Sequence, residues 1–188
     1  MPRAGLSAAS LVESAAALAD AGGYESLSLT TLADSVGVRP PSLYKHIASL
    51  DDLRARLALH AYREIGALLR AALEAPGDAL ANLAAAYRRF TLERPGLAMA
   101  LVRAPAGDDE LTRAAAEVTE PLFALVRGYG IHDPDELVHQ ARILRSALHG
   151  FVSLEAAGGF GLAQSLDATF ERLVAALDVG LRAAASAA

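Results

Sequence analysis

Residues 28–46 constrain the fold of this chain more than any other segment, because a single glycine there separates two apolar stripes. The first stripe has helical spacing after Ser28 and consists of Leu29, Leu32, Ala33 and Val36. Gly37 supplies the positive backbone dihedral that ends such a helix. Pro40 and Pro41 suit the first turn of a second helix, where a missing amide hydrogen costs nothing. The segment therefore predicts two short helices joined by a tight turn.

The second predicted helix has a buried edge and a polar face. Leu43 and Ile47 form the buried edge, and the polar face consists of Ser42, Tyr44, Lys45 and His46. Their hydroxyl, phenol, ammonium and imidazole groups can all bond phosphate oxygens or base edges, and a first helix packed behind them would fix their angle to a duplex. Two helices joined at a glycine also occur in all-α proteins that never touch nucleic acid, so periodicity alone leaves both interpretations open.

Residue identities favour the DNA-binding interpretation. Three runs carry the argument: Leu32-Ala33-x-x-Val36-Gly37-Val38, then Ser42-Leu43-Tyr44-x-His46, then Asp51-Asp52-Leu53. Together they resemble the N-terminal domain of TetR/AcrR-family transcriptional regulators, over roughly residues 7–60. The resemblance implies a three-helix helix-turn-helix head in residues 1–48. It also implies a helical, ligand-binding and dimerising body in residues 49–188.

The family pattern assigns a contact with DNA to seven of these positions. It places Thr30 and Thr31 near the DNA backbone, Pro41, Ser42 and Lys45 against bases in the major groove, and Tyr44 and His46 on phosphate. The expected partner is therefore a double-stranded operator.

The chain departs from the family pattern at three positions. Leu50 stands where a Lys that grips the DNA backbone is often found, and Ile47 replaces an aromatic residue. Arg39 occupies the place of a small capping residue and puts a positive charge at the turn. We therefore expect weaker phosphate anchoring near Leu50, and we add Arg39 to the predicted DNA-binding residues.

The charge of the chain is unusual for a protein that binds a polyanion. The formal net charge is −5, and residues 1–60 carry five basic against six acidic side chains, a net of −1. Non-specific affinity from counterion release should therefore be modest. Binding would depend on a local cluster around Arg39 and Lys45, presented twice by a dimer.

The composition predicts an all-α fold. Hydrophobic residues make up 53% of the chain but aromatic residues only 5%, because alanine and leucine, both good helix formers, dominate. Breakers such as Pro76-Gly77, Pro95-Gly96 and Gly128-Tyr129-Gly130 divide the chain after a first helix capped by Ser7. The expected body segments are helices at 49–74, 78–94, 110–127, 134–157 and 164–185, a short apolar piece at 97–102 and a loop at 104–109. Pro121 predicts a kink or break within 110–127.

The last two predicted helices each carry an apolar stripe. The stripes are Leu137, Ala141, Leu144, Leu148 and Val152 in the first and Leu166, Phe170, Leu173, Leu177 and Leu181 in the second. Both are typical of helix packing, and an internal core accounts for part of each. Small residues such as Gly150 and Gly180 permit close approach by a partner, and the family resemblance assigns these helices to a homodimer interface.

A ligand pocket in the body should be mainly apolar with a few polar groups. The segment from Ser146 to Glu155 resembles a histidine–glycine-containing subgroup of the family. The candidate lining residues for a small apolar or amphipathic effector are Phe90, Met99, Phe123, Arg145, His149 and Phe151. For the aromatic residues and Met99, ordinary core packing is the preferred explanation, whereas for His149 and Arg145 a structural and a functional role are equally well supported.

The sequence gives no support for an enzyme or a cofactor protein. Without cysteine there is no disulfide framework, zinc ribbon or thiol nucleophile, which suits a reducing cytoplasm. The pair Glu136-x-x-His139 has the spacing of half a di-metal site, but no second such pair accompanies it. Neither a phosphate-binding glycine loop nor a Gly-x-Ser-x-Gly elbow is present, and no apolar segment is long enough for a membrane span.

The sequence thus predicts a cytoplasmic, ligand-released repressor that acts as a homodimer on a near-palindromic operator. The alternative is a helical protein that binds small molecules or other proteins and whose head no longer reads DNA. The missing Lys at Leu50 and the neutral-to-acidic head keep this alternative open.

Overall fold

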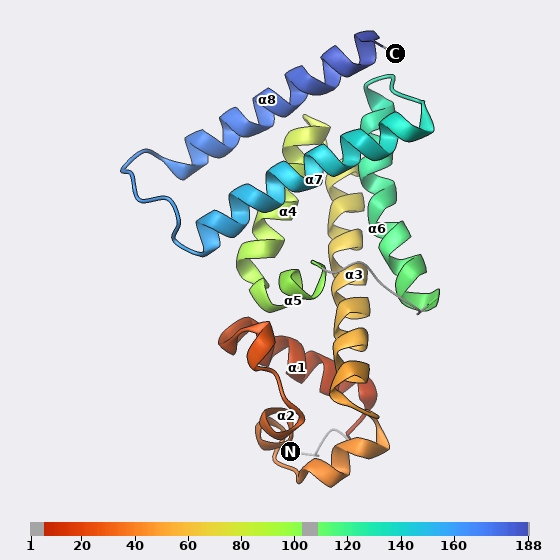
Figure 1. Cartoon of the computed structure of the whole chain (residues 1–188), viewed down its shortest axis with the longest axis vertical. Helices are drawn as coiled ribbons and strands as arrows, with labels where there is room; N and C mark the ends of the chain where they lie inside the picture. Colours follow the sequence, from red (N-terminus) through yellow and green to blue (C-terminus); the bar gives the residue numbers. More distant parts are fainter. Residues whose placement is uncertain (1–5, 103–108, 188) are drawn as a thin grey trace. The chain divides into compact units, whose positions relative to one another are not determined.

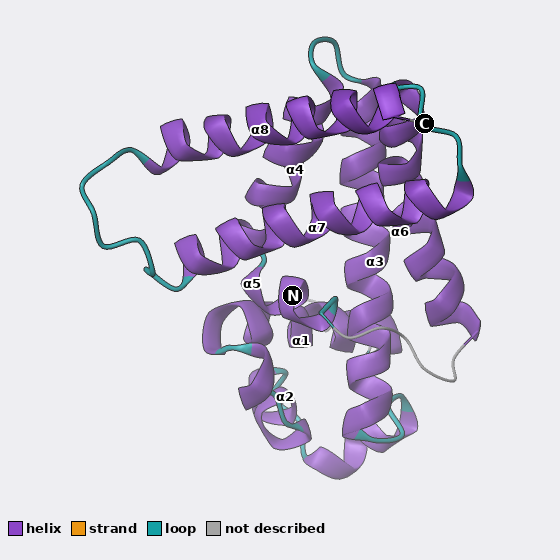
Figure 2. Ribbon diagram, turned by 45° about the horizontal axis from the view of Figure 1, so that its top comes forward, coloured by secondary structure: helices purple, strands orange, loops and turns teal. Residues whose placement is uncertain are grey.

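The computed structural model describes residues 6–102 and 109–187, and these contain helices and connecting turns but no strand (Figures 1 and 2). The chain divides into two compact units. The first unit comprises Met1–Arg63 and Glu93–Ala114, and the second comprises Glu64–Leu92 and Ala115–Ala188. The head boundary predicted after residue 48 falls inside the first unit.

The first unit is built from short helices and the start of a long one. In chain order these are α1 (Ala8–Gly22), η1 (Tyr24–Ser26), α2 (Leu29–Ser35), η2 (Pro40–Lys45), the beginning of α3 (Leu50–Glu74) and α5 (Pro95–Ala100). The predicted caps are confirmed, since the Ser7 and Ser28 hydroxyls accept hydrogen bonds from the amides of Ser10 and Thr31, both at 3.1 Å. Gly37 has a φ of 70° after α2, as the predicted turn requires.

Asp20 fixes α5 against α1 within the first unit. Its carboxylate accepts hydrogen bonds from Arg94 Nε at 2.7 Å, from the Gly96 amide at 2.8 Å and from the Leu97 amide at 3.2 Å. The two amides belong to the first turn of α5 and have no partner inside that helix. Asp20 therefore satisfies these donors and pairs with a guanidinium at the same time.

The second unit contains the longer helices. It consists of the rest of α3, then α4 (Ala79–Glu93), most of α6 (Asp109–Gly128), α7 (Pro134–Ala156) and α8 (Leu166–Ala187). All five residues of the predicted α7 stripe are buried, whereas in α8 only Phe170, Leu177 and Leu181 are. Helix α6 continues through Pro121 instead of breaking there. The predicted loop at 104–109 lies almost wholly outside the described residues.

Arg88 of α4 holds the last two helices together. Its Nε donates to Glu155 of α7 at 2.8 Å, and its Nη1 lies 2.7 Å from a carboxylate oxygen of Asp167 in α8. The guanidinium also lies 4.9 Å from the ring centroid of Phe170, whose ring is 5.2 Å from that of Phe151. The hydrogen bond that Arg88 donates to Glu155 leads the interactions that raise the pKa of Arg88, so the guanidinium stays charged.

Candidate DNA-binding surface and ligand-recognition residues

The segment predicted to read DNA is η2, and it is a 3-10 helix, not an α-helix. Pro40 and Pro41 have no amide hydrogen, so the first available donor is the Ser42 amide, which bonds the Arg39 carbonyl at 2.9 Å. At the other end the His46 amide bonds the Leu43 carbonyl at 2.8 Å. Both bonds span three residues, which is the spacing of the tighter helix. The sequence periodicity predicted a helix here but not its type.

The buried edge of η2 is confirmed. Leu43 and Ile47 have no exposed surface, and neither has Leu32 of α2 within the same unit. Because these side chains are closely packed, η2 has little freedom to rotate about its own axis. The side chains on its other face are therefore held in fixed directions.

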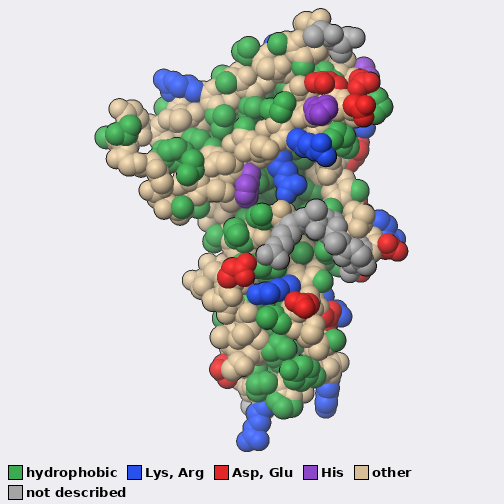
Figure 3. Space-filling view, viewed as in Figure 1, with side chains coloured by type: hydrophobic (Ala, Val, Ile, Leu, Met, Phe, Trp, Pro, Cys, Tyr) green, Lys and Arg blue, Asp and Glu red, His purple; other side chains and the backbone are tan. Residues whose placement is uncertain are grey.

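The predicted DNA-binding side chains lie on the open face of this unit. Seven of them are exposed and His46 is half-buried; the seven are Thr30, Thr31, Arg39, Pro41, Ser42, Tyr44 and Lys45. Tyr44 is 58% exposed, which is unusual for an aromatic residue in a small helical unit. In Figure 3, Lys or Arg side chains project from the part of the surface that corresponds to the orange segment containing η2 in Figure 1. A phenol, a hydroxyl and two cations are thus exposed within residues 39–45.

The turn that follows η2 is held by Asp52. Its carboxylate accepts the Ala48 amide at 2.8 Å and Arg56 Nε at 2.7 Å, while its own amide donates to Ser49 Oγ at 3.0 Å. Burial would raise the pKa of Asp52, but the bonds from Ala48 and Arg56 outweigh it and lower that pKa. The carboxylate therefore stays ionised and fixes the start of α3 behind η2. Leu50, which replaces the expected Lys, is half-buried in this turn.

The six candidate ligand residues are divided between the two compact units. Met99 is 48% exposed and belongs to the first unit, whereas the other five belong to the second. Phe90 and Phe151 are buried, Phe123 and His149 are half-buried, and Arg145 is exposed. None of the six lines either of the two cavities described in the second unit.

His149 lies within hydrogen-bonding distance of Tyr87 and Ser153, and of these three residues the sequence analysis had singled out only His149. Its Nδ1 is 3.0 Å from the Tyr87 hydroxyl of α4, and its Nε2 is 3.4 Å from Ser153 Oγ one turn along α7. Burial raises the pKa of Tyr87, so the phenol remains a neutral hydrogen-bonding group. Tyr87 and Arg88, which the sequence analysis missed, are adjacent in α4, and the sequence around them does not indicate their partners in α7.

The environment of His149 predicts acid sensitivity. Burial and the charge of Arg145 lower its pKa below the ordinary 6.5, so the folded chain binds a proton there less readily than the unfolded chain. The resulting stabilisation is complete above pH 6.5 and is lost as the pH falls through the folded-state pKa. We expect His149→Gln, which keeps a polar side chain, to lose less unfolding free energy between about pH 7 and pH 5 than the natural chain. Urea titrations at the two pH values measure this, and equal losses would contradict it.

Among residues 6–102 and 109–187, no three His, Cys, Asp or Glu side chains gather as metal ligands. Glu136 accepts a hydrogen bond from Gln140 at 2.6 Å. No helix in the same described part of the chain is long and apolar enough to cross a membrane.

Sequence comparisons match this chain to regulators of transcription. A family model described as the tetracyclin repressor-like C-terminal domain matches residues 80–177. A helix-turn-helix-type transcriptional regulator of Mycobacterium tuberculosis is 36% identical over 180 residues, which cover 94% of this chain and 82% of that protein. YobS of Bacillus subtilis, also a helix-turn-helix-type transcriptional regulator, is 35% identical over 162 residues, which cover 85% and 84% of the two chains.

Solved structures share the architecture. A protein of unknown function from Rhodococcus sp. RHA1 has a TM-score of 0.77 at 25% identity, covering 97% of this chain and 98% of its own. ActR of Streptomyces coelicolor has a TM-score of 0.73 at 20% identity, with coverages of 96% and 97%. A TetR variant of Acinetobacter baumannii in complex with minocycline has a TM-score of 0.71 at 22% identity, with coverages of 96% and 99%. The last two likenesses show a common fold alone.

Proposed function

Because the chain belongs to the TetR family of transcriptional regulators, we propose that it is a repressor that binds a near-palindromic operator as a homodimer and is released by a small ligand. Its relatives are DNA-binding regulators of transcription and not enzymes. A cytoplasmic location, where the DNA is, follows from the same proposal. The observation that carries it is the exposed face of η2, fixed from behind by Leu43 and Ile47.

The proposed contacts divide by chemistry. Arg39 and Lys45 supply the cations, and the Ser42 hydroxyl and Tyr44 phenol supply neutral hydrogen bonds to base edges or phosphate. Thr30 and Thr31 in α2 would lie against the DNA backbone. The small number of cations predicts a shallow dependence on salt, because few counterions are released.

A mobility-shift experiment tests the proposal. The probe is the DNA upstream of the protein's own coding sequence, and salt concentration is varied. Salt-sensitive binding with a two-fold footprint supports the repressor. No shift at micromolar protein in low salt would overturn it and would favour a helical carrier or interaction protein, the alternative that the net charge of residues 1–60 suggested.

We propose that α7 and α8 form the homodimer interface. Ile143 of α7 is 50% exposed and Val179 of α8 is 65% exposed, and both are large apolar side chains that a partner would cover. A Cβ added at Gly150 or Gly180 would meet nothing within 4 Å in one protomer, so both positions leave room for a partner. Two heads joined in this way could occupy successive turns of one duplex face.

The variant Val179→Glu tests the interface. In an isologous dimer the change adds two carboxylates near the symmetry axis, so we expect the dimer to dissociate at least about tenfold more readily. Sedimentation velocity measures the dissociation. Leu92→Glu is the matched control, because Leu92 is also exposed, at 40%, but lies in α4. A dimer unaffected by Val179→Glu would exclude α8 from the interface.

The proposed effector is apolar or amphipathic and binds in the second unit. Phe90, Phe123 and Phe151 supply apolar surface there, and His149 and Arg145 supply polar groups. Release of DNA requires that the effector bind the non-operator state better than the operator-bound state. Effector and operator should then weaken each other's binding by the same factor, which titrations of each in the presence of the other can measure.

A further inference from the structure

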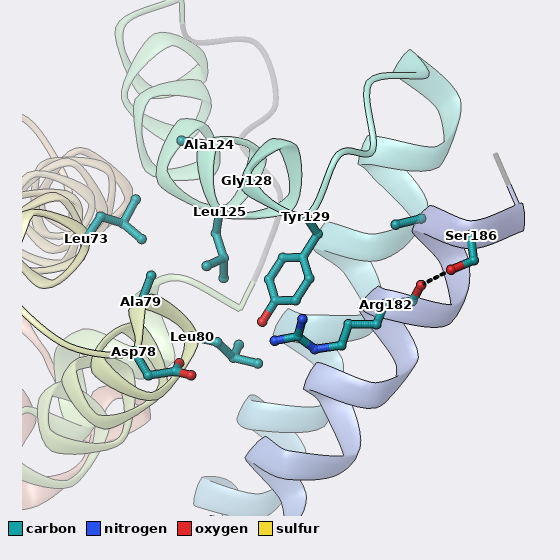
Figure 4. A pocket seen from close by; sticks show the side chains of 11 residues that line it. Leu73, Asp78, Ala79, Leu80, Ala124, Leu125, Gly128, Tyr129, Arg182 and Ser186 are labelled. Atoms are coloured by element: carbon teal, nitrogen blue, oxygen red, sulfur yellow. Dashed lines mark hydrogen bonds between the residues drawn. The ribbon is translucent and has the colours of Figure 1, made fainter.

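A cavity of about 750 Å³ lies in the second unit, away from the six candidate ligand residues. Its walls come from the end of α3, the start of α4, the end of α6 and the end of α8. Leu73, Leu80 and Leu125 provide aliphatic surface, and Asp78, Tyr129 and Arg182 provide polar groups (Figure 4). The volume falls in the range of drug-sized ligand sites, and the lining combines apolar and polar surface in comparable amounts, which suits an amphipathic ligand.

We propose that this cavity binds a small organic cation with an apolar body, and that Asp78 receives the cationic group. The proposal is independent of DNA binding, and its site does not include His149 or Arg145. Whether the cavity attracts a cation or an anion depends on which of its charged side chains are already paired with an opposite charge.

The guanidinium of Arg182 is neutralised by Asp178. Its Nε and Nη2 donate to the two carboxylate oxygens of Asp178 at 2.9 and 3.0 Å. The Tyr129 hydroxyl also donates to Asp178, at 2.8 Å. Burial, that hydrogen bond and nearby carboxylates raise the pKa of Tyr129, so its proton stays on the phenol. Neither Arg182 nor Tyr129 therefore has an unused charge with which to attract an anion.

Asp78 keeps an unused carboxylate oxygen. Its Oδ1 accepts the Ala81 amide at 2.8 Å and so caps α4, while Oδ2 has no partner among the residues that the structure describes. The side chain is exposed and its charge reaches both Tyr129 and Arg182. Because Asp178, beside the cavity, already pairs with Arg182, the carboxylate of Asp78 gives the lining an unpaired negative charge.

A neighbouring cavity extends this charge pattern. It has a volume of about 370 Å³ and shares Leu73 and Ala124 with the first. Its polar lining consists of one guanidinium and three carboxylates, Arg70, Glu74, Glu117 and Glu120. Arg127 pairs with Glu120 at 2.7 Å, and the carboxylates still remain in excess. The lining of this second cavity therefore also favours a cation over an anion.

Three probes that share one hydrocarbon body and differ in charge test the proposal. Phenylbutylamine is a cation, phenylbutanol is neutral and phenylbutyrate is an anion, and each is titrated into the full chain by calorimetry at neutral pH. We expect the amine to bind about tenfold more tightly than the alcohol, since a charge-assisted hydrogen bond is stronger than a neutral one. The anion should bind most weakly.

Two variants and one control test where the bound cation lies. Asp78→Asn keeps a good N-cap for α4 but removes the charge, so the amine should fall to the affinity of the alcohol. Glu171→Gln is the matched control, because it removes an exposed carboxylate from α8 that does not line the cavity, and it should leave amine affinity unchanged. Ala124→Phe fills the cavity from an exposed position of α6 and should weaken all three probes.

Equal affinity of the amine and the alcohol would overturn the proposal. So would amine binding that survives Asp78→Asn or Ala124→Phe, because the cation would then lie elsewhere, for example beside the aromatic residues near His149. Circular dichroism of each variant shows whether its helices are intact.

Discussion

Replacing Gly96 by Ala should lower the free energy of unfolding by about 3 kcal/mol, at the upper end of what overpacking costs. A Cβ at this position would lie 2.3 Å from the carbonyl carbon of Ala19 and 2.5 Å from the Asp20 amide nitrogen. Both are backbone atoms, so no side chain can turn aside to make room. Helix α5 would have to move away from α1, and the three hydrogen bonds to Asp20 would lengthen together. Urea unfolding measures the loss.

Gly128→Ala is the matched control for this change. Gly128 ends α6, and a Cβ there would meet nothing within 4 Å. The same chemical change should therefore be neutral or slightly stabilising, because alanine restricts the unfolded chain more than glycine does. If Gly96→Ala behaves like Gly128→Ala, the close approach of α5 to α1 does not exist in solution.

The second large effect is expected from Tyr44→Ala combined with Lys45→Ala. Each side chain is exposed on η2, and under the proposed function each contacts DNA in both protomers. Losing four contacts at about 1 kcal/mol each should weaken operator binding by about a thousandfold, since every 1.4 kcal/mol is a factor of about ten. The salt dependence should become shallower by about two counterions, since one ammonium is lost from each head. Fluorescence anisotropy with a labelled operator measures both quantities.

Two controls make this result specific to DNA contact. Arg89→Ala removes an exposed cation from α4, in the second unit, and should leave operator affinity within about twofold, because it touches neither η2 nor α2. Sedimentation and urea unfolding of the double variant should match the natural chain, since both side chains lie outside the core. Undiminished operator binding by the double variant would show that η2 is not the reading element.

The elements that the sequence predicted well are those with local causes. Ser7 and Ser28 cap their helices because the donor lies three residues ahead, and Gly37 turns the chain because only its own dihedral matters. The exposed face of η2 follows from two buried residues four apart. Such features can be recognised in a short window of sequence.

The features that the sequence did not predict depend on distant partners. Asp20 and Gly96 are far apart in the chain, and the sequence around neither residue indicates that a carboxylate caps α5. Met99 was grouped with five residues of another compact unit because apolar side chains in a short segment look alike wherever they pack. The cavity at Asp78 combines four helix ends, and its charge balance depends on the bonds that Asp178 makes.

The cluster around Arg88 has a consequence for the segment between the last two helices. One guanidinium bonds Glu155 before that segment and Asp167 after it, and the rings of Phe151 and Phe170 pack beside it. The alignment of α7 with α8 is thereby set largely by side chains outside residues 157–165. Within that segment Phe160 joins the cluster, since its ring centroid lies 5.0 Å from that of Phe151. Residues 161–164 are exposed, which makes them a natural place to insert a peptide tag or a reporter without disturbing the helices.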